Sequence, residues 1–144
     1  MDIRSVMTPN PACCTQGTTL QEAARLMLEN DCGQIPVMDG GRQPIGVITD
    51  RDIAIRGVAQ GFDPTTTTVG ECMTAPVLTV QEDRPLEDCC QLMEQARIRR
   101  VVVVDGRGGI SGIVAQADIA LSGRDETTAE VVKEVSEPGS RRPQ

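Results

Sequence analysis

The stretch GVITDRDIA, residues 46–54, begins with the end of a β-type apolar run and passes into a helical pattern. Thr49 and Asp52 stand at the transition. The same pattern returns 66 positions later as GIVAQADIA, residues 112–120, where Asp118 takes the place of Asp52 and Ala115 that of Thr49. Outward from these stretches, residues 2–57 match residues 68–123. A repeat of this length is too long for a solenoid unit. The chain is therefore predicted to form two small intertwined halves.

The register between the two copies slips once. Pro11 corresponds to Pro76 at a shift of 65, whereas Leu20 and Leu86 restore the shift of 66. The loop before the first strand of each copy is therefore expected to differ by one residue.

Composition argues against several classes of function. The 144 residues carry a net charge of −7 and no histidine, tryptophan or tyrosine, with Phe62 as the one aromatic residue. Nucleic-acid binding usually needs a basic surface and stacking side chains, so it is not expected. No apolar run approaches the roughly 20 residues that span a bilayer, so we expect no membrane insertion and a cytoplasmic location. Without histidine, and without a nucleophile beside a base, we find no catalytic constellation and do not expect an enzyme.

Both copies show the same order of predicted elements, strand, helix, strand, strand, helix, which is an α+β arrangement. A helical turn capped by Asp2 or Thr68 opens each copy, and a short extended piece follows at residues 12–15 or 77–80. The next helix of each copy has an apolar stripe at helical spacing: Leu20, Ala23, Ala24 and Met27, then Leu86, Cys89, Cys90 and Met93. Asp-Gly turns join strands 34–38 with 45–49 and 101–104 with 110–115, and closing helices are expected over residues 50–60 and 116–122.

Domain boundaries follow from the repeat. Residues 1–60 are expected to form the first copy, 61–67 a linker, 68–124 the second copy, and 125–144 a short helix with a disordered tail. The valines of that last segment, Val131, Val132 and Val135, are typical of a helix face that packs against the body of the protein or a second subunit.

The tandem pattern resembles the paired CBS domain, the regulatory module named after cystathionine β-synthase. The resemblance covers about residues 1–123 and rests on these motifs: Gly46-Val47-Ile48-Thr49-Asp50-Arg51-Asp52, Val6-Met7-Thr8-Pro9, Ile35-Pro36-Val37 and Met73-Thr74-Ala75-Pro76. It implies two CBS repeats packed through their sheets with pseudo-twofold symmetry, two clefts between them, and often a dimer of such pairs. It also implies that the clefts hold an adenosine-containing small molecule, such as AMP, ADP, ATP, S-adenosylmethionine or NAD, and that a separate protein is regulated.

Thr49 and Asp52 are the first candidate ligand-binding residues. A carboxylate can accept hydrogen bonds from both ribose hydroxyls, while a hydroxyl and free N–H groups at a helix start can hold a phosphate. The same Thr-x-x-Asp spacing is typical of a capping box, so both interpretations stay open. In the second copy Ala115 lacks the hydroxyl, which puts phosphate binding in doubt and leaves Asp118 as a ligand residue or a dipole-favoured carboxylate.

The remaining candidates come from a strand and from a basic cluster. By resemblance, Ile35, Pro36 and Val37 flank the base of the nucleotide, with plain core as the alternative, above all for Val37. Arg99 stands in the densest basic cluster of the repeat region and is the candidate to reach a phosphate. A solvated surface is the alternative for that cluster.

Six cysteines raise the alternative of a redox or metal-responsive protein. Most stand opposite apolar residues of the other copy, as Cys13 stands opposite Leu78, and are interpreted as small buried hydrophobes. Cys14, opposite Thr79, is the candidate for a reactive thiol. No pair has Cys-x-x-Cys spacing, which disfavours a zinc site.

The sequence thus predicts a homodimeric regulatory protein that binds an adenine nucleotide as a ligand, has no cofactor or metal, and acts on an unknown regulated protein in trans. The main alternative is a ligand-free dimeric scaffold. Both hypotheses share the same fold, so the site must separate them.

Overall fold

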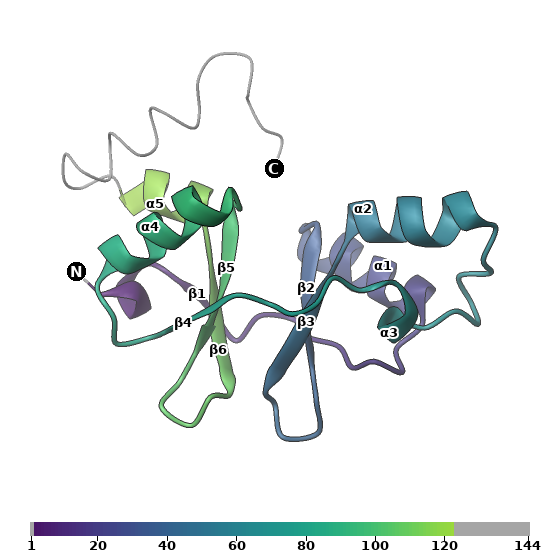
Figure 1. The fold of residues 1–144 in the computed structure, drawn as a ribbon, viewed down its shortest axis with the longest axis horizontal. Coiled ribbons are helices and arrows are strands. Elements are labelled where there is room, and N and C mark those ends of the chain that lie inside the picture. The colour runs from purple at the N-terminus through teal and green to yellow at the C-terminus, as the bar shows by residue number, and fades with distance from the viewer. Residues whose placement is uncertain (1, 123–144) are drawn as a thin grey trace, which may run out of the picture. The chain divides into compact units, whose positions relative to one another are not determined.

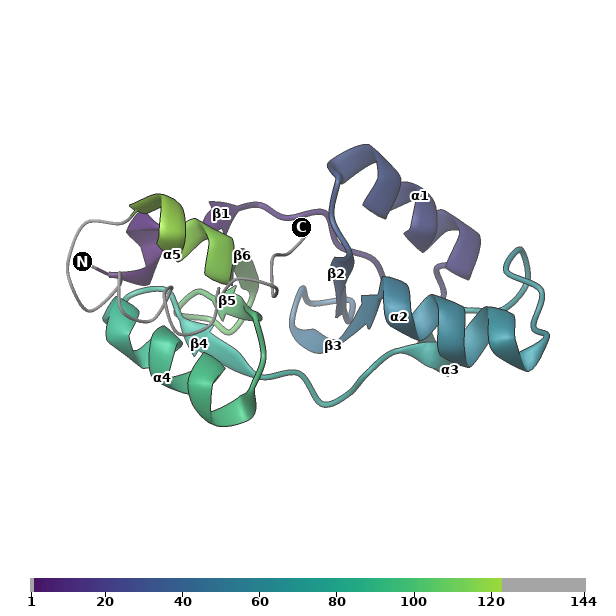
Figure 2. The same ribbon diagram turned by 90° about the horizontal axis from the view of Figure 1, so that it is seen from above.

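The computed structural model describes residues 2–122, which form two compact units (Figures 1 and 2). The first-copy unit contains residues 11–78 and 108–110, and the second-copy unit contains residues 2–10, 79–107 and 111–122. Each unit mixes helices with strands, so the predicted α+β class is confirmed. The helix expected around Val131, Val132 and Val135 lies outside the described residues.

From Leu20 onward the elements of the first-copy unit follow the predicted order, whereas the extended piece expected at residues 12–15 is reduced to one bridge residue, Cys14. Their bounds are α1 (Leu20–Asn30), β2 (Gln34–Met38), β3 (Pro44–Thr49), α2 (Asp50–Asp52), the π-helical turn η2 (Ile53–Gly57), the 3-10 turn η3 (Val58–Gln60) and α3 (Val69–Cys72). Strands β2 and β3 pair antiparallel, and Cys14 forms a parallel bridge to Val37. Since α2, η2 and η3 follow one another directly, the helix expected over residues 50–60 is confirmed.

Helix α1 begins with a capping box. The Thr19 hydroxyl accepts a hydrogen bond from the Glu22 N–H at 3.1 Å, and the Glu22 carboxylate accepts one from the Thr19 N–H at 3.0 Å. The apolar stripe of α1 packs on the strands, and the core contains Cys14, Leu20, Ala23, Met27, Ile35, Val37, Ile48, Val69 and Cys72. Ala24 is exposed, so its predicted burial is wrong. Ala24 lies at one edge of the predicted apolar stripe, and the spacing of apolar residues does not show which edge of a helix the neighbouring strands leave uncovered.

The second-copy unit has seven elements among the described residues: the 3-10 turn η1 (Ile3–Ser5), β1 (Thr8–Pro9), β4 (Thr79–Gln81), α4 (Leu86–Ala96), β5 (Arg100–Val104), β6 (Ile110–Ala115) and α5 (Gln116–Ser122). Its sheet has the order β1-β6-β5-β4, with β4 parallel to β5 and β1 antiparallel to β6. The core contains Ile3, Leu86, Cys89, Cys90, Met93, Val101, Val103, Val114 and Ile119. The second predicted stripe, on α4, is therefore buried as expected.

Each unit contains the Met-Thr segment of the opposite copy. The segment with Thr74 lies along β3, where the Thr74 N–H donates to Val47 O at 2.8 Å and the Val47 N–H donates to Thr74 O at 2.9 Å. The segment with Thr8 lies along β6, with Thr8 opposite Ile113. We call residues 2–10 and 68–78 the exchanged segments. The compact units therefore cut across the two sequence copies.

The glycines that open the repeated motif make room for the exchanged segments. A Cβ atom on Gly46 would lie 2.7 Å from the Thr74 carbonyl oxygen, and one on Gly112 would lie 2.9 Å from the Thr8 carbonyl oxygen. Real Cβ atoms essentially never approach so closely. A glycine at this position in both copies is thus a requirement of backbone packing.

Candidate functional site

Thr49 and Asp52 lie where β3 passes into α2. The Asp52 N–H donates to the Thr49 hydroxyl at 2.9 Å, and the Thr49 N–H donates to Asp52 Oδ2 at 3.1 Å. The capping box considered from the sequence is therefore present. Asp52 is 7% exposed, so its carboxylate is held at the edge of the core and not on an open helix end.

Two further side chains approach the Asp52 carboxylate. The Thr74 hydroxyl, from an exchanged segment, lies 3.1 Å from both Oδ1 and Oδ2. The Arg56 Nε atom lies 3.9 Å from Oδ1, while Arg56 Nη1 donates to the Met73 carbonyl oxygen at 3.2 Å. A buried carboxylate needs such compensation, since leaving it without partners costs several kcal/mol.

Sequence reasoning missed both of these residues. Arg56 stands four positions after Asp52 in the closing helix, and this spacing was an available signal for an ion pair. Thr74 comes from the other copy, 22 positions away from Asp52, and no local pattern indicates the contact.

The strand candidates have divided positions. Ile35 and Val37 are 1% and 0% exposed and belong to the core, so the alternative of plain core describes their side chains. Pro36 lies between them on β2 and is also buried, although its side chain points to the opposite face of the strand because successive strand residues alternate. The pairing of Gln34 with Thr49 brings the start of β2 beside the Thr49–Asp52 pair.

The second copy repeats part of this geometry. The Asp118 Oδ2 atom accepts a hydrogen bond from the Ala115 N–H at 2.8 Å, so Asp118 performs the acidic half of a capping box at the start of α5. The Gln116 N–H donates to the Arg99 carbonyl oxygen at 2.8 Å, which brings the backbone of Arg99 to the same helix start, and Arg99 is exposed. Asp118 and Arg99 are therefore near neighbours within one unit, whereas Thr49 and Asp52 belong to the other unit.

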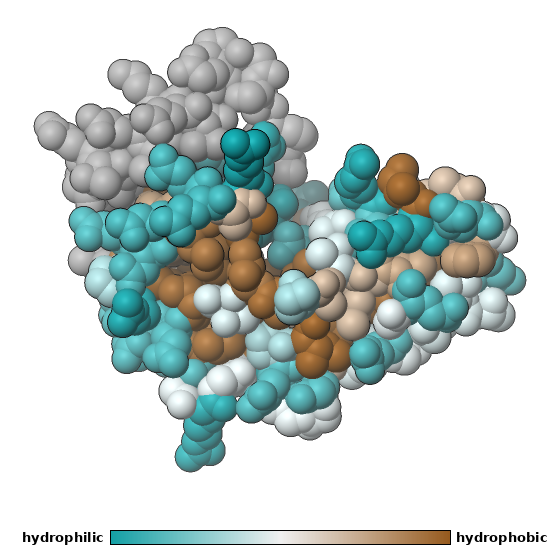
Figure 3. Space-filling model, in the orientation of Figure 1, coloured by the Kyte–Doolittle hydropathy of each residue, from teal (hydrophilic) through white to brown (hydrophobic). Residues whose placement is uncertain are grey.

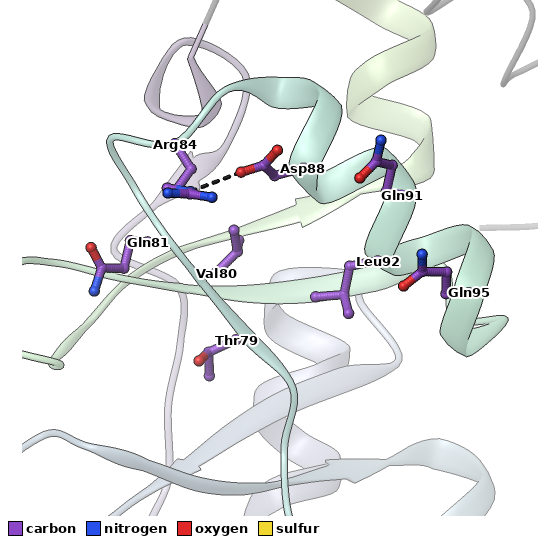
Figure 4. A pocket seen from close by; sticks show the side chains of 8 residues that line it. All are labelled: Thr79, Val80, Gln81, Arg84, Asp88, Gln91, Leu92 and Gln95. Carbon is purple, nitrogen blue, oxygen red and sulfur yellow. Dashed lines mark hydrogen bonds and ion pairs between the residues drawn. The ribbon is translucent and has the colours of Figure 1, made fainter.

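A groove of about 560 Å³ lies elsewhere, between β4 and α4 of the second-copy unit (Figure 4). Its lining contains none of the predicted site residues and consists of Thr79, Val80, Gln81, Arg84, Asp88, Gln91, Leu92 and Gln95. The two charged members neutralise each other, since Arg84 Nε lies 2.8 Å from Asp88 Oδ2. The groove therefore offers amides and a hydroxyl, but no uncompensated charge for a phosphate.

The structure contradicts the predicted role of Cys14. The bridge from Cys14 to Val37 matches the pairing of Val80 with Val103, so the shift of 66 already holds at Cys14 and the slip falls between residues 11 and 14. Cys14 thus corresponds to the half-buried Val80 and not to the exposed Thr79, and it is itself 4% exposed. Burial, with a smaller contribution from Cys13, raises the pKa of the Cys14 thiol to about 12. The prediction that Cys14 is the reactive thiol is therefore wrong.

All six cysteines are free thiols. Within residues 2–122, no three cysteine or carboxylate side chains are grouped closely enough to hold a metal ion. In the same part of the chain, no helix is long and apolar enough to cross a membrane.

Comparison with known proteins identifies the family. The model of the CBS domain matches residues 3–57 and again residues 69–123, the same two copies that the internal repeat defines. Hypoxic response protein 1 of Mycobacterium tuberculosis is 33% identical over 135 residues, which cover 94% of each chain. The chain therefore belongs to the CBS domain family, as the sequence motifs predict.

Solved structures of the family have the same fold. Hypoxic Response Protein I, with two coordinated zinc ions, matches with a TM-score of 0.77 and 35% identity over 84% of this chain and 98% of that chain. CBSX2 in complex with AMP matches with a TM-score of 0.70 and 27% identity over 84% and 94%. The CBS domain pair of MJ0100, in complex with 5-methylthioadenosine and S-adenosylmethionine, matches with a TM-score of 0.74 and 28% identity over 85% and 94%.

Proposed function

We propose that this protein is a regulatory module that senses an adenosine compound of the AMP, ADP, ATP or S-adenosylmethionine class. The observation that carries the proposal is the Thr49–Asp52 pair after β3, in a family whose members include complexes with AMP and with S-adenosylmethionine. The carboxylate offers acceptors to ribose hydroxyls, and the Thr49 hydroxyl with the helix start offers donors to phosphate. Ligand binding acts by population shift, which requires that the ligand favour one conformation over another.

The second copy is proposed to take a ligand differently. Asp118 supplies the ribose acceptor, while Ala115 removes the hydroxyl that Thr49 provides in the first copy. The exposed Arg99 side chain, next to the start of α5, offers a guanidinium to the phosphate instead. Such a site would depend more on Arg99 than the first site depends on any arginine.

The protein is proposed to act as a homodimer in the cytoplasm, on a separate regulated protein. Apolar side chains reach the surface of the first-copy unit over its helices (Figure 3). Leu28 on α1, Ile55 on η2 and Val58 on η3 are 81%, 47% and 63% exposed. A second copy that covers them would remove this apolar surface from water.

A ligand-free scaffold is the second candidate, and one observation favours it. Both carboxylates have structural work: Asp52 accepts bonds from Thr49 and Thr74, and Asp118 accepts one from Ala115. A carboxylate retained only for capping explains the repeat of this aspartate without any ligand.

Calorimetric titration with AMP, ATP, S-adenosylmethionine and NAD separates the two candidates. The wild type is compared with Asp52→Asn and Asp118→Asn, and with Thr19→Ala as a matched control that weakens the α1 capping box without touching the proposed site. A sensor gives heat that Thr19→Ala preserves, while Asp52→Asn abolishes the contribution of the first-copy site and Asp118→Asn that of the second-copy site. Folding of every variant is checked by circular dichroism. Silence toward all four compounds at millimolar concentration contradicts the sensor and leaves the scaffold.

A further inference from the structure

We propose that the Thr74 hydroxyl competes with ribose for the Asp52 carboxylate and thereby tunes the affinity and ribose preference of the first-copy site. The inference rests on the proposed function above. Thr74 belongs to an exchanged segment, and its hydroxyl lies 3.1 Å from each carboxylate oxygen of Asp52. Thr74 is thus a positioning residue that acts through Asp52.

The competition follows from the acceptor capacity of the carboxylate. An ionised carboxylate has about four lone-pair positions on its two oxygens. The Thr49 N–H uses one position on Oδ2, at 3.1 Å, on the side of the capping box. A hydroxyl equidistant from Oδ1 and Oδ2 occupies the face that the two oxygens share. The two hydroxyls of a ribose need that same face to donate one hydrogen bond to each oxygen.

The backbone of Thr74 has hydrogen bonds of its own, separate from the bond that its hydroxyl donates to Asp52. Two hydrogen bonds join the backbone of Thr74 to Val47, and Arg56 Nη1 holds the neighbouring Met73 carbonyl oxygen. The Thr74 carbonyl oxygen lies against Gly46, where an added Cβ atom would come within 2.7 Å of it. Thr74 itself is exposed, so its hydroxyl can turn about χ1 toward water. Displacement by ribose therefore requires a side-chain rotation and no movement of the exchanged segment.

The consequence is a measurable effect on affinity. A hydrogen bond to a charged group contributes more than one between neutral groups, and water recovers part of it when the hydroxyl turns away. We expect removal of the hydroxyl to tighten AMP binding by about tenfold. Binding of 2′-deoxy-AMP should tighten less, because it lacks the second hydroxyl that would use the vacated face. The dissociation constant for 2′-deoxy-AMP divided by that for AMP should therefore be larger in a variant without the Thr74 hydroxyl than in the wild type.

The test is calorimetric titration of the full chain with AMP and with 2′-deoxy-AMP. Thr74→Val removes the hydroxyl at similar volume, and Thr74→Ser is the matched control that keeps it, with thermal unfolding measured for each variant. The expected result is tighter AMP binding and a larger ratio for Thr74→Val, with Thr74→Ser close to the wild type.

Other outcomes overturn the inference. An unchanged or weaker AMP affinity of folded Thr74→Val, an unchanged ratio, or equal effects of Thr74→Val and Thr74→Ser each contradict the competition while leaving the nucleotide sensor intact. Silence of both the wild type and Thr74→Val toward AMP, ATP, S-adenosylmethionine and NAD contradicts the proposed function, and the inference falls with it.

Discussion

Gly46→Ala tests the packing of β3 against the exchanged segment. The new methyl carbon would lie 2.7 Å from the Thr74 carbonyl oxygen and 3.1 Å from the Met73 sulfur, whereas ordinary contacts begin at 3.4 Å. The backbone must therefore give way by about 0.7 Å, and this stretches the two hydrogen bonds between Val47 and Thr74. Overpacking of this kind costs about 1–3 kcal/mol, and weakened hydrogen bonds add to it. We expect the free energy of unfolding to fall by about 2–3 kcal/mol.

The assay is urea denaturation followed by far-ultraviolet circular dichroism, because the chain has no tryptophan or tyrosine to give a fluorescence signal. Gly40→Ala is the matched control, since no atom lies within 4 Å of its new methyl group and its φ is not positive. This control should stay within about 0.5 kcal/mol of the wild type. A loss below about 0.5 kcal/mol for Gly46→Ala, or an equal loss for Gly40→Ala, would refute the packing argument.

Three further predictions use the same protein. Thr49→Ala should lower the free energy of unfolding by about 1 kcal/mol through loss of the N-cap, and Thr49→Ser should restore most of it in urea denaturation. Burial raises the pKa values of Cys14 and Cys89 to about 12 from 9.0, so the stability they contribute is complete below pH 9 and is lost as the pH rises toward 12. Urea midpoints that stay constant over this range would contradict it. Leu28→Glu should convert a dimer to a monomer in light scattering, whereas Glu29→Gln should not.

Local patterns were sufficient for most of the fold. The stripes on α1 and α4, the Asp-Gly turns and the two copies of the motif each involve residues a few positions apart, and their physics is local. The position of the register slip between the two copies could not be predicted from local patterns. Pro11 and Leu20 bracket it in sequence, but only the pairing of Cys14 with Val37 shows on which side of the cysteines it falls. That is why Cys14 was predicted to be a reactive thiol although it is buried.

The candidate site was predictable in part for the same reason. The Thr49–Asp52 pair is a three-residue spacing, so both of its possible roles could be stated from the sequence. The contact of Thr74 with Asp52 depends on a segment from the opposite copy, and no spacing rule reaches that far. For Ile35 and Val37 the strand pattern identifies burial, but it does not say whether a ligand or other core side chains cover them.

The exchanged segments also bear on how a chain of this kind can arise. A polypeptide with a single copy of the motif has a glycine that must be covered by a Met-Thr segment, yet in the present chain each copy's own segment serves the other unit. Such a polypeptide can complete its fold by trading segments with an identical molecule, as domain-swapped pairs do. Gene duplication and fusion would then join the two partners and make the trade intramolecular. By this logic, we expect a polypeptide of residues 1–67, which contains one copy, to associate in pairs.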